Sequence, residues 1–118
     1  MWGLFSAGIV EGEEAGADVL IPHMGLTTKG SIGAKSAMTL AAAAKRVQDL
    51  ADAAKRVKPD ILVLCHGGPI SEPSDVRYIL DNTKGIAGFF GASSIERLPT
   101  EVAITECTRR FKSIQFKR

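Results

Sequence analysis

Three short apolar segments, each followed by glycine, mark this chain as an alternation of strands and helices. The clearest is residues 60–66, DILVLCH, which is rich in branched side chains and is followed by Gly67 and Gly68. The other two segments are residues 18–23, DVLIPH, and residues 85–90, GIAGFF. An apolar run without polar alternation is typical of a strand buried on both faces, as in a parallel sheet. We therefore expect three parallel strands.

Between these segments, apolar residues recur at helical spacing. In residues 40–57 they fall three or four positions apart, with Thr39 as a candidate N-cap and Pro59 as a stop. A shorter helix is predicted over residues 73–82, because its first residue is proline, which suits a first-turn position. A third helix is predicted to begin near Pro99. Its apolar side follows steps of four and three, so the buried residues should be Ala103, Cys107, Phe111 and Ile114.

The order of elements, strand then helix three times over, predicts an α/β fold with a parallel sheet and right-handed crossovers. Residues 4–10 and 11–17 offer a fourth, degraded unit of a strand and a very short helix. The length of 118 residues fits one domain, so we expect residues 1–118 to fold as a single domain with an atypical start over residues 1–14.

Composition excludes several classes of partner. The net charge is only +2 and the acidic and basic residues are interspersed, which gives no electrostatic case for nucleic acid or an anionic membrane. The apolar residues 1–5 lack a basic flank, so no signal peptide or membrane span is predicted. Cys65 and Cys107 do not make a disulfide framework, and we expect an intracellular, cytoplasmic protein.

Two histidines end the first two predicted strands. His23 and His66 are both followed by glycine-rich sequence, and in parallel sheets ligands gather outside the carboxyl ends of the strands. Imidazole groups in that place suit general acid–base catalysis or metal ligation. The alternative is a structural histidine with satisfied hydrogen bonds, and the sequence leaves both interpretations open.

Two short loops, after the second and third predicted strands, are candidates for anion binding. In residues 91–94, GASS, small residues let backbone amides approach an anion and two hydroxyls add donors. Gly67 and Gly68 lead into a helix, whose N-terminus favours negative charge. Arg97 could contact the anion or pair with Glu96. The alternative is that the glycines only form tight turns.

The predicted loop over residues 25–36 is long for a connection between a strand and a helix. Its glycine, threonine, serine and lysine content suits a mobile lid over an anionic ligand, with Lys29 as a second positive charge. A solvated excursion without function is the alternative. The loop is not a P-loop, because Lys29 precedes the second glycine of the motif rather than following it.

Metal chemistry has little support in the sequence. Magnesium prefers carboxylates, and Asp18 and Asp60 stand at the starts of their predicted strands, away from the histidines. Cys65 and His66 are adjacent, so in a strand their side chains point to opposite faces and cannot share a zinc ion. We expect no metal site and no cofactor within this chain.

Three motifs resemble the phosphoenolpyruvate hydrolase-like family, also described as TIM-barrel signal transduction proteins. They are residues 23–28, HMGLTT, residues 64–70, LCHGGPI, and residues 88–99, GFFGASSIERLP, and the resemblance extends over about residues 15–114. It implies a (β/α)₈ barrel related to phosphoenolpyruvate- and pyruvate-binding barrels. Because a complete barrel needs about 250 residues, the chain should form roughly half of one, the C-terminal half, with parallel strands and outer helices.

The resemblance also implies a function. The expected ligand is a small phosphorylated carboxylate such as phosphoenolpyruvate, which the domain would bind or hydrolyse. Hydrolysis would need the missing half barrel, and that half would also have to supply any divalent metal. The alternative is a non-catalytic barrel that serves as a scaffold for protein–protein interaction. Family barrels often assemble, and an open half barrel exposes strand edges and apolar surface, so we expect a homo-oligomer. The candidate catalytic residues are His23, His66 and Glu96, and the candidate ligand-binding residues are Gly25, Thr27, Thr28, Gly67, Gly68, Gly91, Ala92, Ser93, Ser94 and Arg97.

Overall fold

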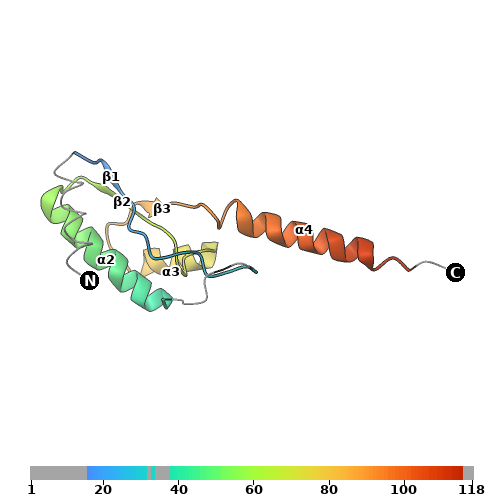
Figure 1. The fold of residues 1–118 in the computed structure, drawn as a ribbon. Coiled ribbons are helices and arrows are strands. Elements are labelled where there is room, and N and C mark those ends of the chain that lie inside the picture. Colours follow the sequence, from blue (N-terminus) through green and yellow to red (C-terminus); the bar gives the residue numbers. More distant parts are fainter. Residues whose placement is uncertain (1–15, 32, 34–37, 116–118) are drawn as a thin grey trace.

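The computed structural model describes residues 16–31, 33 and 38–115, and within them it shows a parallel sheet with helices packed on one side (Figure 1). The strand order is β1-β2-β3, and both neighbouring pairs are parallel. The predicted α/β class with parallel strands and outer helices is confirmed, as a partial barrel. In chain order the elements are β1 (Val19–Leu20), α2 (Leu40–Val57), β2 (Leu62–Cys65), α3 (Pro73–Asp81), β3 (Gly88–Phe89) and α4 (Arg97–Lys112).

Helix α2 forms as its sequence signals predict. The Thr39 side chain accepts a hydrogen bond from the amide of Ala42 at 3.1 Å, and the helix ends at Val57, two residues before Pro59. One face packs on the sheet and on α3 through small side chains, which let the helix axis lie close to its neighbours. The buried residues of α2 are Ala43, Ala44, Val47, Ala51 and Ala54.

The two faces of the sheet differ. Val63 and Cys65 of β2 are fully buried against the helices, and Figure 1 shows α2 and α3 on the same side of the strands. The opposite face is open, because Leu62 is 53% exposed and its neighbour Val19 is 43% exposed. The expectation of a strand buried on both faces is therefore wrong. Alternate residues of a strand point to opposite faces, and only one face has helices packed against it.

Helix α3 closes the core from the side. Pro73 occupies its first turn, and Glu72 and Asp75 form a reciprocal capping box at its start. Ile79 is fully buried between α2 and the sheet, in the same cluster as Ile70 of the preceding turn. The predicted helix over residues 73–82 is confirmed to within one residue.

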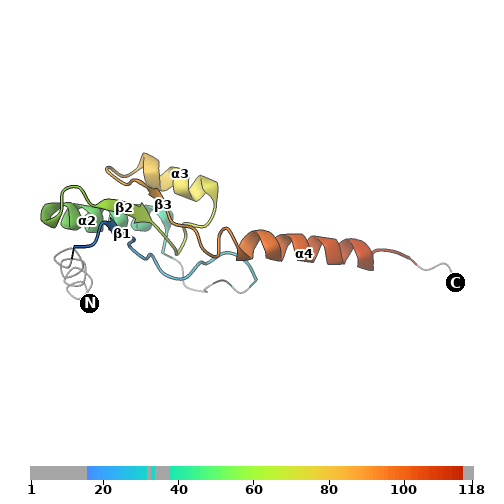
Figure 2. The same cartoon turned by 90° about the horizontal axis from the view of Figure 1, so that it is seen from above.

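Helix α4 departs most from the prediction. None of its residues is buried, and Ile104, Phe111 and the following Ile114 are 61%, 71% and 60% exposed. Figures 1 and 2 show the helix projecting away from the sheet, along the 72 Å long axis of a molecule that measures 26 Å in the other directions. The predicted burial of Ala103, Cys107, Phe111 and Ile114 is wrong. In the described residues β3 is the edge strand, so α4 has no further strand to pack against.

The first strand is shorter than its apolar run. Pairing in β1 covers only Val19 and Leu20, after which Pro22 interrupts the ladder because it has no amide hydrogen. Pairing resumes as a single bridge at His23. The predicted strand over residues 4–10 and most of the short helix over 11–17 lie outside the described residues, and Gly16 and Ala17 are not helical.

Candidate functional site

The structure brings the two histidines together at the carboxyl ends of β1 and β2. His23 and His66 form an isolated parallel bridge, and the amide of Met24 donates to the carbonyl of His66 at 2.9 Å. Their rings are in contact edge to face, with centroids 4.9 Å apart. The two imidazoles therefore lie side by side at one rim of the sheet.

The histidines lie on the open face of the sheet. His66 follows the buried Cys65, so its side chain points away from α2 and α3 and to the side of Leu62. The ring of Phe90, at the end of β3, contacts the ring of His66 with centroids 5.3 Å apart. Three rings thus run in a row across three adjacent strand ends. In a closed barrel, this face would be the interior.

Backbone groups fix a different proton position on each imidazole. The amide of Gly25 donates to Nδ1 of His23 at 3.1 Å, so a neutral His23 ring carries its proton on Nε2. Nδ1 of His66 lies 2.8 Å from the carbonyl oxygen of Phe90, which can only accept. A neutral His66 ring therefore has its proton on Nδ1 and a free lone pair on Nε2.

Gly67 and Gly68 form a turn that places the end of β2 next to the loop that begins at Met24. Their φ angles are +79° and +60°, and a Cβ on Gly68 would collide with the carbonyl of Met24. The amide of Gly68 donates to the carbonyl of Gly25 at 2.6 Å. It is therefore already used inside the protein, and these glycines serve first to let two loops approach closely.

The turn over residues 91–94 is different. Within the described part of the chain, no hydrogen bond takes up the amides of Gly91, Ala92, Ser93 or Ser94, or the two serine hydroxyls. The four residues are half-buried. The amides of the next residues are used in contrast, since those of residues 95 and 96 donate to the Ala92 carbonyl. This turn presents six hydrogen-bond donors directly after Phe90, whose carbonyl holds His66.

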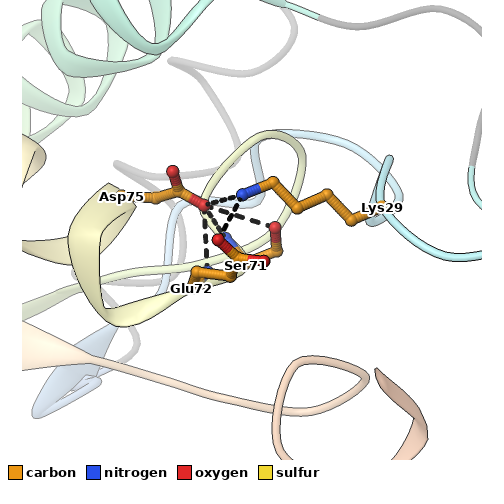
Figure 3. A network of polar contacts seen from close by, with 4 residues as sticks. All are labelled: Lys29, Ser71, Glu72 and Asp75. Carbon is orange, nitrogen blue, oxygen red and sulfur yellow. Dashed lines mark hydrogen bonds and ion pairs between the residues drawn. The ribbon is translucent and has the colours of Figure 1, made fainter. Parts of the chain in front are cut away.

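The N-terminus of α3 is already occupied by a carboxylate (Figure 3). Oδ2 of Asp75 accepts from the amides of Ser71 and Glu72 at 3.2 and 2.9 Å and from the Ser71 hydroxyl at 3.3 Å. Nζ of Lys29 lies 2.9 Å from both Asp75 and Glu72. An external anion would have to displace Asp75, so the predicted anion site at this helix start is filled from within the chain.

The same network shifts the pKa values of its charged groups. Partial burial acts to raise the pKa of Asp75, but the hydrogen bonds from Lys29, Ser71 and Glu72 outweigh it and the pKa is lowered. Burial acts to lower the pKa of Lys29, and the hydrogen bonds and charges of Glu72 and Asp75 raise it overall. The positive charge of Lys29 is thus held by two carboxylates.

Arg97 is engaged as well. One guanidinium nitrogen lies 2.9 Å from Glu101, and the other donates to the Lys29 carbonyl at 2.9 Å, so Arg97 pairs with Glu101 and not with Glu96. Glu101 in turn accepts from the amide of Ser31 at 2.5 Å, and this bond, with Arg97 nearby, lowers the pKa of Glu101. The described part of the predicted lid is therefore tied to the starts of α3 and α4.

Similarity to known proteins identifies the family of this chain. The model of the phosphoenolpyruvate hydrolase-like family matches residues 9–114. The chain belongs to this family. It is 56% identical over 104 residues to two tomato (Solanum lycopersicum) proteins, the ToMV susceptible protein tm-1(GCR26) and the ToMV resistance protein Tm-1(GCR237), which covers 88% of this chain and 14% of each relative. It is 29% identical over 100 residues to the putative transcriptional regulatory protein y4pA of Sinorhizobium fredii, over 85% of this chain and 16% of that protein. The chain thus spans about a seventh of the length of these curated relatives.

The remaining predicted residues of this family member take minor positions in the site. Glu96 is the exposed N-cap of α4, and no contact among the described residues joins its carboxylate to either histidine. The amide of Thr28 donates weakly to the Gly68 carbonyl at 3.4 Å, and Thr27 is half-buried beside it.

Sequence reasoning missed two residues that shape the site, Asp75 and Phe90. The available signal for Asp75 was an acidic residue in the first turn of a helix that begins at Pro73, since Glu72 stands where the usual capping-box sequence has Ser or Thr. Nothing local marks Phe90.

An apolar cavity of about 390 Å³ opens between α3 and the segment after β3. Val76, Leu80, Phe89 and Ile95 line it, and Ser94 reaches it from the 91–94 turn. In the described residues no group of three or more histidine, cysteine or acidic side chains could hold a metal ion. No helix among them is both long enough and apolar enough to cross a bilayer.

Proposed function

We propose that the strand-end rim of this chain binds a small phosphorylated carboxylate such as phosphoenolpyruvate, with the phosphate on the 91–94 turn. The observation that carries the proposal is the set of unused donors, four amides and two hydroxyls, on one half-buried turn. Successive backbone amides in a turn can form an anion-binding concavity without any cationic side chain. Family membership supports the choice of ligand class.

The two histidines supply the chemistry next to the phosphate. His66 is hydrogen-bonded to Phe90, the residue directly before the turn, and its ring contacts that of His23. We therefore place the carboxylate end of a ligand held by residues 91–94 towards the two imidazoles. Proton transfer to or from the ligand is the role that such groups suit. Arg97 and Lys29 are not assigned to the ligand, because their charges are already paired with Glu101, Glu72 and Asp75. Binding then depends mostly on neutral donors.

Amide chemical shifts test this assignment in the 118-residue chain. We expect phosphoenolpyruvate and inorganic phosphate to cause saturable shifts of the amides of residues 91–94 at millimolar concentration. The amides of Ser71 and Glu72 are the internal control, because they donate to Asp75 and should move little. Shifts confined to Ser71 and Glu72, or no shift at millimolar ligand, would contradict the proposed site.

A matched pair of serine variants sharpens the test. Replacing both Ser93 and Ser94 with alanine removes two hydroxyl donors and should weaken phosphate binding about tenfold, the usual scale for losing such hydrogen bonds. Ser74→Ala is the control, because Ser74 is an exposed residue of α3 outside the rim. Equal affinities for the double variant and the control would place the phosphate elsewhere.

We also propose a second candidate function, a scaffold whose α4 docks a second copy of this chain. The specific observation is a group of exposed apolar side chains on α4, namely Ala103, Ile104, Cys107 and Phe111. Exposed apolar groups of this kind mark association surfaces.

The described cysteines, Cys65 and Cys107, are free thiols, which supports placing either function in the reducing cytoplasm.

A further inference from the structure

We propose that His23 and His66 work as one donor–acceptor unit for a hydroxyl group, in which His66 takes the proton and His23 holds the oxygen. The choice of ligand rests on the proposed function above. The division of roles between the two rings does not, since it follows from their hydrogen bonds to the backbone.

His66 is held by one neighbour in two ways. Its Nδ1 donates to the Phe90 carbonyl at 2.8 Å, and its ring packs edge to face on the Phe90 ring. The first contact fixes the proton on Nδ1, and the second restrains rotation of the ring. Nε2 is therefore left as a lone pair on the open face of the sheet, which is the arrangement of a general base.

His23 is held in the opposite tautomer. Its Nδ1 accepts from the amide of Gly25 at 3.1 Å, so the proton of the neutral ring sits on Nε2. A Cβ at Gly67 would lie 3.5 Å from this Nε2, which shows that the backbone of the glycine turn passes close to the donor atom. A side chain at position 67 would crowd the atom that we assign as the donor.

The two rings are complementary because one presents N–H and the other a lone pair, with centroids 4.9 Å apart. A group that can satisfy both must accept from His23 and donate to His66, as a hydroxyl or a water molecule does. In the proton transfer, the O–H bond breaks and an N–H bond forms on Nε2 of His66. The resulting imidazolium keeps its Nδ1–H on the Phe90 carbonyl, and the oxygen anion keeps the hydrogen bond from His23.

The same hydrogen bonds argue against a metal bridging the pair. A metal ion binds an imidazole nitrogen through its lone pair, and here only His66 offers one on Nε2. His23 would have to lose the Gly25 contact before its Nε2 could act as a ligand. The described residues also bring no third ligand to the pair.

Long-range ¹H–¹⁵N spectra of the imidazole rings test the division of roles directly, at a pH about two units above the ordinary histidine pKa. We expect His23 to be protonated on Nε2 and His66 on Nδ1. The same tautomer in both rings, or the two reversed, would overturn the inference. This measurement needs no ligand, so it separates failure of the inference from failure of the proposed function.

Isosteric variants test whether the unit binds a hydroxyl. At position 23, glutamine can present an amide donor near the place of Nε2, whereas asparagine can only replace Nδ1. We therefore expect His23→Asn to weaken binding of a hydroxyl-bearing probe about tenfold and His23→Gln to weaken it less. At position 66, asparagine preserves a donor for Phe90 but removes the acceptor, and the same loss is expected.

Two probes separate the source of the hydroxyl. 2-Phosphoglycerate carries its own hydroxyl, and phosphoenolpyruvate has none. If the ligand supplies the hydroxyl, His23→Asn weakens 2-phosphoglycerate alone. If a bridging water supplies it, both probes weaken about equally. Unchanged affinity for both in His23→Asn and His66→Asn would overturn the hydroxyl assignment, and if neither probe binds the wild type, the tautomer measurement still decides the roles.

Discussion

Helices α2 and α4 have similar lengths and opposite environments. Both have apolar residues at helical spacing, but α2 buries five residues against the sheet and α3, whereas α4 buries none. The two helices differ in which strands lie next to them. Helix α2 crosses between two paired strands, and α4 leaves the edge strand β3 with no further strand beside it in the described residues. An apolar stripe thus identifies the side of a helix that requires a partner, and the partner must come from elsewhere.

The largest expected effect on stability comes from a substitution in the core that α2 and α3 share. Ile79→Ala removes a fully buried side chain that packs with Val47 and Cys65. We expect a loss of about 2–5 kcal/mol in the free energy of unfolding, because the cavity left behind adds to the lost apolar burial. Urea denaturation measures it. Phe111→Ala on α4 is the control and should lower the stability of the monomer by less than about 0.5 kcal/mol.

Equal effects of these two substitutions would mean that α4 packs on the core in solution. The comparison between the buried and the projecting helix would then be wrong, and so would the assignment of α4 to a partner.

Signals that act within a few residues were read correctly from the sequence. Thr39 and Pro59 bound α2, and the repeated strand-end histidines meet because equivalent positions of adjacent parallel strands are neighbours. Features that depend on distant partners were not predictable. Lys29 and Asp75 are 46 residues apart in sequence, so the pair that fills the α3 start could not be foreseen.

The two failed burial predictions share one physical cause. The apolar run at residues 60–66 and the apolar residues of α4 both suit a complete barrel, in which each face would have a neighbour. Leu62 and Phe111 are exposed here because those neighbours are not among the described residues. Sequence pattern reports what a surface is suited to contact and says nothing about whether the contact is made within the chain.

Asp75 holds the start of α3 by accepting hydrogen bonds from the preceding backbone and from Lys29. Asp75→Ala leaves the amides of Ser71 and Glu72 and the ammonium of Lys29 without their acceptor. We expect a loss of about 1–3 kcal/mol in the free energy of unfolding. Asp75→Asn is the matched control: it retains a neutral acceptor for the two amides and should lose less. A similar loss in both variants would assign the whole effect to the charge.

The same carboxylate predicts a pH dependence. Because the folded-state pKa of Asp75 lies below its ordinary value of 3.8, its stabilisation is fully present above that value and is lost as the pH falls through the folded pKa. The wild type should therefore lose stability in acid more steeply than Asp75→Asn. Parallel stability curves for the two proteins below about pH 4 would contradict the assigned role of Asp75.

The smallest change in stability, and the sharpest test of α4, is expected from Phe111→Ser. Phe111 is 71% exposed and no described residue buries it, so its loss should leave the monomer intact while it removes a large part of the apolar side of the helix. In sedimentation velocity runs at increasing concentration, the wild type should associate and the variant should remain monomeric to higher concentration. Lys45→Gln on the exposed side of α2 controls for a general change of surface. A wild type that stays monomeric throughout would remove the reason for assigning α4 to a second copy.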